Sequence, residues 1–246
     1  MKESTKPADS TRLTCQALQV GYGTSPLLPA FDMQVCAGEV WALVGRNGSG
    51  KSTLLRTLLG ELRPVTGRYS VTPDASLAHV AQRGSHDLCV PARAWDMVEG
   101  GVDRGWGFLR WRGREALVRR ALSEVGAEAL AKEPFAHLSE GQKQRILMAR
   151  ALASGPDVLL LDEPTSAMDP MAEREIFDLI DALRVSHGLA VIIASHSMAV
   201  LPAIATHVVF LDRDDQIALT GERCQVLSDP RFQARYGKVV PTGDAS

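Results

Sequence analysis

The sequence predicts an α/β fold: a mixed, mainly parallel sheet with flanking helices, and a helical subdomain inserted between the core strands. Apolar runs without a polar break are typical of parallel strands covered on both faces, and they occur at Val40–Val44, Val158–Leu161 and Leu189–Ala194. Helix-patterned segments follow these runs, as in βα units. From residue 91 to residue 136 the pattern changes to short helical stretches with glycine breaks, which indicates the insertion.

The composition fits one large domain and excludes several classes of protein. With 246 residues and 45% hydrophobic content the chain can bury a sizeable core, and a net charge of −2 gives no footprint for nucleic-acid binding. Residues 1–11 are polar and predict a flexible tail, not a signal peptide. No apolar run approaches the roughly 20 residues that span a bilayer. The four cysteines lack metal-ligand spacing, which favours small buried or reduced thiols.

A first strand is expected at Leu13–Val20, before a turn at Gly21-Tyr22-Gly23. The Tyr22 ring on this turn could stack on a nucleotide base. It could equally be a half-buried turn tyrosine, and the turn alone leaves both interpretations open.

The residues between Val44 and Leu54 predict a phosphate-binding loop, because a GxxxxGKS pattern stands between a strand and a helix. Glycines let the backbone curl so that N–H groups and the helix N-terminus point at a triphosphate. Lys51 supplies a mobile charge for the outer phosphates, and the Ser52 hydroxyl is placed to ligate Mg²⁺. The loop residues of interest are Gly45, Asn47, Gly48, Ser49, Gly50, Lys51, Ser52 and Thr53.

Gly60 and Pro64 end the helix that follows the loop, and short strands are expected at Gly67–Val71 and Leu77–Ala81. The second strand leads directly to Gln82. On its own, a glutamine at a strand end is an ordinary surface amide.

The inserted region carries one clear helix, Glu115–Val125, with its apolar residues on one face. Ahead of it, residues 104–114 place two tryptophans among four arginines. Such a mixture is typical of a partner-binding surface, of an amphipathic loop, or of a base-stacking tract. Base stacking is the least favoured of the three, because the tract is short and isolated, and the other two stay open.

A capped helix start is predicted at Ser139, followed by an alanine-rich helix over Lys143–Ser154. Ser139 as the N-cap leaves backbone N–H groups and a positive dipole end available to an anion. The intervening residues are Glu140, Gly141 and Gln142.

Two adjacent acids, Asp162 and Glu163, follow a buried strand at the sheet edge where open α/β folds bind ligands. Asp162 can hold the magnesium shell, and Glu163 can take a proton from an attacking water. Asp169-Pro170 then starts a helix that continues to Gly188, and the next strand leads to His196. Strands at His207–Leu211 and Gln216–Leu219 and a helical tail to Tyr236 complete the chain.

Taken together, GRNGSGKS, Gln82, LSEGQ, LLLDE, Asp169 and His196 stand in the order and rough spacing of an ATP-binding cassette (ABC) ATPase. The chain resembles this family over about residues 12–225. The resemblance implies a P-loop NTPase core at about 12–90 and 155–225, a helical subdomain at about 91–154 and a C-terminal tail at 226–246. It also implies a head-to-tail dimer with each ATP between the phosphate loop of one subunit and the signature LSEGQ of the other.

The family also implies roles for individual residues. Tyr22 would stack on adenine, and the phosphate loop would bind the phosphates together with Gln82. The catalytic residues would be Lys51, Glu163 and His196. Mg²⁺ would be bound by Ser52 and Gln82 and, through water, by Asp162. The residues completing the partner's site would be Ser139, Gly141 and Gln142, with Asp169 communicating across the dimer.

Two residues depart from the family pattern. Glu140 stands where glycine is usual, and because a carboxylate repels a triphosphate we expect it to point away from the nucleotide. Ser197 stands where an aspartate frequently follows the histidine. The histidine itself is retained.

The expected function is that of an ATP-hydrolysing subunit on the cytoplasmic face of the inner membrane, driving solute transport through separate permease subunits. Residues 96–101 and 107–112 are similar to bacterial zinc, manganese or iron importers, so a metal ion or metal chelate is the expected solute and a solute-binding protein an expected partner. Two alternatives are a soluble ABC ATPase, as in iron–sulfur cluster assembly, and a nucleotide-binding module without hydrolysis. The second is disfavoured because Lys51, Glu163 and His196 are all present.

Overall fold

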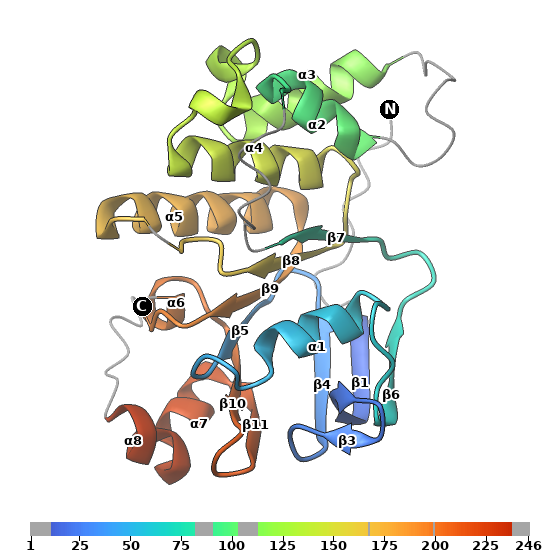
Figure 1. The fold of residues 1–246 in the computed structure, drawn as a ribbon, viewed down its shortest axis with the longest axis vertical. Coiled ribbons are helices and arrows are strands. Elements are labelled where there is room, and N and C mark those ends of the chain that lie inside the picture. Colours follow the sequence, from blue (N-terminus) through green and yellow to red (C-terminus); the bar gives the residue numbers. More distant parts are fainter. Residues whose placement is uncertain (1–10, 82–90, 103–112, 167, 199, 238–246) are drawn as a thin grey trace.

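The computed structural model describes residues 11–81, 91–102, 113–166, 168–198 and 200–237 (Figure 1). Its centre is a sheet of six strands in the order β11-β10-β5-β9-β8-β7, parallel except for the antiparallel edge pair β10 and β11. The predicted mainly parallel α/β fold is therefore confirmed. The strands are β5 (Val40–Val44), β7 (Leu77–Val80), β8 (Val158–Asp162), β9 (Ala190–Ser195), β10 (His207–Asp212) and β11 (Ile217–Glu222).

A second sheet, antiparallel and three-stranded, packs beside the first in the order β4-β1-β6. It contains β1 (Thr11–Gln19), β4 (Phe31–Cys36) and β6 (Thr66–Val71), and a small hairpin joins β2 (Gly21–Tyr22) to β3 (Ser25–Pro26). The strand β4 was not predicted, although its residues alternate between buried and exposed as a one-sided strand should. The first strand includes Thr11, which the sequence analysis had assigned to the tail, and residues 1–10 lie outside the described residues.

The strands of the central sheet bury alternate side chains in two different cores. Val191 and Ile193 of β9 pack on the side of the long helix α5 (Pro170–His187), and Ile192 packs on the side of α1 (Lys51–Leu58) and the antiparallel sheet. An apolar side chain is therefore needed at every position of such a strand, which explains the unbroken apolar runs.

Helices gather at one end of the molecule, beyond α5 (Figure 1). They are α2 (Ala94–Val102), α3 (Arg114–Glu124) and α4 (Glu140–Leu152), joined by two 3₁₀ turns, η2 (Glu128–Leu130) and η3 (Phe135–His137). The opposite end carries α7 (Arg223–Ser228) and α8 (Pro230–Tyr236), and α6 (Val200–Ala203) is a single short turn. Among the described helices none is both long and apolar enough to cross a membrane.

The predicted Mg²⁺ ligand Gln82 and residues 104–112 of the tract rich in tryptophan and arginine lie outside the described residues. The signature helix differs slightly from its prediction. It begins at Glu140 and not at Lys143, because Ser139 caps it directly.

Candidate active site

The loop between β5 and α1 has the curled backbone that the sequence predicts. Gly48 and Gly50 have φ values of 81° and 103°, in the left-handed region where residues with a Cβ atom are strained. The helix α1 then begins at Lys51 with no side-chain cap on Gly50. Its first backbone N–H groups are therefore available to an anion.

Lys51 is held inside this loop and does not extend into solvent. Its side chain is 6% exposed, and Nζ donates hydrogen bonds to the carbonyl oxygens of Gly45 at 2.7 Å and Arg46 at 3.1 Å. Burial lowers the pKa of Lys51, while the charge of Glu163, whose Oε1 lies 4.0 Å from Nζ, opposes that shift. The lysine thus presents a fixed positive charge at the base of the loop.

The two acids that end β8 face different partners. Asp162 Oδ1 accepts a hydrogen bond from Ser52 Oγ at 3.3 Å, so it lies against the start of α1. Burial raises the pKa of Asp162, against the effect of the Ser52 hydrogen bond. Glu163 has a φ of 50°, which is uncommon for a residue other than glycine, and its N–H donates to the Ala194 carbonyl at 2.9 Å.

Glu163 and His196 meet across neighbouring strands. Because β8 and β9 are parallel and paired, their carboxyl ends lie together, and Glu163 Oε2 is 2.5 Å from His196 Nδ1. The Glu163 side chain is 8% exposed whereas the His196 ring is 59% exposed. The buried acid is therefore oriented by a histidine whose other ring edge remains open.

These groups open into one cleft of about 510 Å³. Tyr22 stands at its mouth, 56% exposed, with its hydroxyl 3.3 Å from Thr53 Oγ1. Of the residues predicted from the sequence, those lining the cleft are Tyr22, Asn47, Gly48, Gly50, Lys51, Ser52, Thr53, Glu163 and His196.

Gly45 and Ser49 belong to the loop but do not line the cleft; Gly45 contributes its carbonyl to Lys51 and Ser49 is buried. Leu27 and Arg213 line the cleft and were not predicted. A signal for Arg213 existed, since it directly follows a parallel strand at the ligand-binding edge of the sheet.

The residues of the signature lie elsewhere, in a separate hollow of about 280 Å³ beside the start of α5. Ser139 forms a capping box with Gln142: its hydroxyl accepts from the Gln142 N–H, and the Gln142 side chain accepts from the Ser139 N–H. Gly141 and Asp169 line the same hollow, and Asp169 caps α5 through the N–H groups of Met171 and Ala172. Glu140 Oε1 is paired with Lys143 Nζ at 3.0 Å.

The donor atoms at the loop fit Mg²⁺. The Ser52 hydroxyl and the Asp162 carboxylate are hard oxygen donors within 3.3 Å of each other, the ligand type that Mg²⁺ prefers. The half-buried Asp162 carboxylate, whose pKa is raised by desolvation, would be stabilised by a cation. Gln82, the other predicted ligand, lies outside the described residues.

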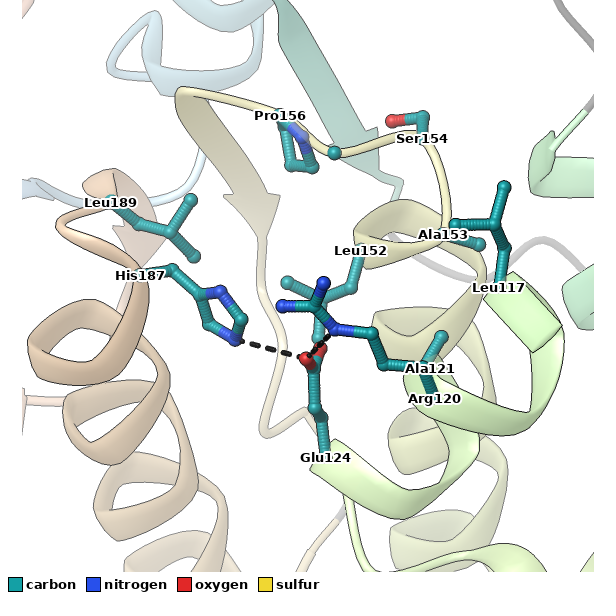
Figure 2. Close-up of a pocket in the computed structure, with 11 residues that line it drawn as sticks. Leu117, Arg120, Ala121, Glu124, Leu152, Ala153, Ser154, Pro156, His187 and Leu189 are labelled. Atoms are coloured by element: carbon teal, nitrogen blue, oxygen red, sulfur yellow. Dashed lines mark hydrogen bonds and ion pairs between the residues drawn. The ribbon is translucent and has the colours of Figure 1, made fainter. Parts of the chain in front are cut away.

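A third hollow, of about 210 Å³, lies between α3 and the end of α5 (Figure 2). There Glu124 accepts from Arg120 Nε at 2.7 Å and lies 3.4 Å from His187 Nε2. None of the predicted site residues that the structure describes lines it, and its ionic groups bond to one another. It holds no further part of the candidate active site.

Comparisons with known proteins identify the family of this chain. The model of the ABC transporter family matches residues 28–166. The zinc import ATP-binding protein ZnuC of Pseudomonas putida is 34% identical over 228 residues, 91% of this chain and 84% of the relative. ZnuC of Cereibacter sphaeroides is 35% identical over 227 residues, 92% of this chain and 89% of the relative.

Solved structures of ABC transporter proteins are also similar to this chain. A metal-chelate type ABC transporter in an inward-facing conformation is similar with a TM-score of 0.83 and 31% identity, over 92% of this chain and 88% of that one. The chain cbiO1 of Clostridium perfringens, part of the cbiONQ transporter complex, is similar with a TM-score of 0.78 and 28% identity, over 92% and 96%.

Proposed function

This chain belongs to the ABC transporter ATPase family, and from that premise we propose that its hydrolysis of ATP powers the import of zinc or a closely related metal ion. The observation that carries the proposal is the single cleft in which Lys51, Glu163 and His196 converge, in a chain whose relatives include zinc import proteins. The solute enters through separate permease subunits, as the membership of cbiO1 in a larger complex supports.

Hydrolysis in this scheme depends on positioning and charge, as phosphoryl transfer generally does. Lys51 stabilises the outer phosphates, and Glu163 orients the attacking water and accepts its proton. Since His196 uses Nδ1 to hold Glu163, its Nε2 edge is the one left to face the γ-phosphate. Tyr22 stacks on the adenine at the mouth of the cleft.

Mg²⁺ is the cofactor that this arrangement requires, because it would neutralise charge on the phosphate oxygens. Ser52 would hold the ion directly and Asp162 through water, with Gln82 as a further ligand. The hydrogen bond of 3.3 Å from Ser52 Oγ to Asp162 Oδ1 supports this assignment, because it places the two oxygen donors side by side.

A second subunit completes the site in our proposal. The signature residues Ser139, Gly141 and Gln142 lie in a hollow apart from the cleft of their own chain, so a nucleotide that they contact would be one bound by another copy. Asp169, beside them, would relay the state of one site to the other. The expected assembly is a head-to-tail homodimer on the cytoplasmic face of the inner membrane, with a solute-binding protein outside it.

The decisive test combines genetics and purification in the native cell. We expect deletion of the gene to arrest growth when a chelator lowers zinc, and added zinc to restore it. The wild-type gene should complement the deletion and the Glu163→Gln variant should not. The tagged protein should co-purify from detergent-solubilised membranes with a polytopic membrane protein.

Recovery of only soluble partners, with no tagged chain in the membrane fraction, would contradict transport and favour a soluble ABC ATPase. A deletion strain that is insensitive to zinc depletion but sensitive to depletion of iron or manganese would support a transport function. It would show that the transported metal is not zinc. The two outcomes are distinct because fractionation does not depend on which metal is carried.

A further inference from the structure

The cleft has a second cation, Arg213, which the sequence motifs do not include. It lies in the turn between β10 and β11, and its side chain lines the cleft together with Tyr22 and the phosphate loop. In the described part of the chain no carboxylate lies within ion-pair distance of its guanidinium. An arginine in this position is available to an anion.

The turn that carries Arg213 is held firmly. Asp212 accepts from the N–H groups of Asp214 and Asp215 at 3.0 and 3.3 Å, and Arg235 pairs with both Asp212 and Asp214. The carboxylates of Asp212 and Asp214 are therefore occupied within the turn and by Arg235.

Two further contacts join the turn to the walls of the cleft. Gln216 Nε2 donates to the carbonyls of Arg213 at 2.8 Å and Leu27 at 3.2 Å, which connects the turn to the segment following the Tyr22 hairpin. Arg46 of the phosphate loop lies 4.0 Å from Asp214. Arg213 is thus fixed relative to both the loop and the Tyr22 side of the cleft.

The strand order tells which part of a nucleotide Arg213 meets. In the central sheet β5, which leads into the phosphate loop, lies between β10 and β9. Glu163 and His196, the groups for the γ-phosphate, stand on the β8 and β9 side. Arg213 stands on the opposite flank, beside the segment that follows the Tyr22 hairpin, on the side where a base stacked on Tyr22 would place the inner phosphates.

We propose that Arg213 is a nucleotide-binding residue that pairs with the inner phosphates of ATP and ADP alike. Because the contact is made equally before and during hydrolysis, it contributes to affinity and not to the chemical step. This extends the ATP site and does not depend on which solute is transported.

The test is the affinity of Arg213→Ala for ADP and for a non-hydrolysable ATP analogue, both with Mg²⁺. We expect Kd to rise about three- to tenfold for both nucleotides, the size of a charge-assisted contact at a partly solvated site. The KM for ATP should rise equally while kcat stays within about twofold. Arg213→Lys should recover part of the affinity, and the difference should shrink at high salt.

The matched control is Arg119→Ala, an exposed arginine of α3 paired only with Glu115 in the described structure. Equal behaviour of the two variants would overturn the proposal, as would a loss of affinity confined to the ATP analogue, which would place Arg213 at the γ-phosphate.

Gln216→Ala serves as a second variant. Its loss of affinity should vanish when Arg213→Ala is already present, and an additive loss would show that the turn acts without Arg213. Unchanged melting temperatures verify that the variants fold.

Discussion

The cleft and the signature hollow contrast in how complete they are. In the cleft, functional groups from three strands and a helix bond to one another: Lys51 to the loop, Ser52 to Asp162, and Glu163 to His196. In the signature hollow the bonds stabilise helices: Ser139 caps α4, Asp169 caps α5, and Arg145 pairs with Glu175. The groups that the proposed hydrolysis uses meet in the first region, whereas the second region shares no lining residue with it.

This difference implies that nucleotide binding and turnover can be separated in the proposed scheme. One chain would hold the groups that bind a nucleotide and activate water, so an isolated subunit is expected to bind ATP. The signature would contribute only when a second copy brings it to the nucleotide. Substitutions in the two regions should therefore change different measured quantities.

The largest effect is expected from Glu163→Gln in the cleft. The amide cannot accept the proton of the attacking water, so kcat should fall by about 10²–10⁴ while ATP still binds. Phosphate release measures turnover, and equilibrium dialysis measures binding. The exposed Glu115→Gln serves as control, and turnover of Glu163→Gln near the wild-type value would refute the role given to Glu163.

Next in size is Ser139→Ala in the signature. Loss of one donor to the charge that develops in the transition state should lower kcat by about 10², with the Kd of the isolated subunit for ATP unchanged. Measuring both quantities on the same preparation tests the contrast directly. A raised Kd at a concentration where the chain is monomeric would show that Ser139 acts on the nucleotide bound by its own chain. The separation of the two regions would then be wrong.

Mixing the two variants sharpens the contrast further. In a head-to-tail dimer of Glu163→Gln with Ser139→Ala, one of the two sites keeps an intact cleft and an intact signature. An equal mixture should regain about a quarter of the wild-type activity, since half of the dimers carry one good site. No regain after subunit exchange would argue against the head-to-tail arrangement.

Tyr22→Ala should act on binding alone. Loss of base stacking is worth about 1–3 kcal/mol, so the Kd for ATP should rise about 5- to 150-fold with kcat at saturation preserved. Tyr22→Phe is the matched control, because it keeps the ring and removes only the hydroxyl contact with Thr53. Equal affinity of the Ala and Phe variants would show that the tyrosine is an ordinary turn residue.

The smallest effect is expected from Arg145→Ala, which loosens the signature helix without touching the cleft. Arg145 donates to the Val125 carbonyl at 3.1 Å and to Glu175 at 3.2 Å, and thus joins α4 to the end of α3 and to α5. The free energy of unfolding should fall by about 1–2 kcal/mol, measured by urea denaturation. ATP affinity should stay within about twofold, and a larger loss would show that the two regions are coupled within one chain.

The sequence predicted the individual helices and strands of this fold better than the order in which the strands pair. Strands buried on both faces, such as Val158–Asp162, are recognisable because both cores demand apolar residues. The missed strand Phe31–Cys36 alternates polar and apolar residues in a short segment with no motif to mark it. The strand order, with β5 between β9 and β10, depends on long-range packing that no local pattern reports.

The candidate site was predictable where motifs carry the chemistry. Glu163 and His196 are 33 residues apart, yet both follow parallel strands, so their meeting could be expected from the sheet edge. Arg213 was missed because its turn, Asp212-Arg-Asp-Asp215, resembles an ordinary charged surface loop. Its role emerges only when Asp212 and Asp214 are seen bonded to Arg235.

The backbone of Glu163 has one more consequence. Its left-handed conformation costs a residue with a Cβ atom about 1–2 kcal/mol, a strain that glycine would avoid. Glycine at position 163 would therefore relieve this strain, but it would also remove the carboxylate that contacts His196 and that the proposed hydrolysis requires. The residue that stabilises the fold less is the one that the proposed chemistry needs.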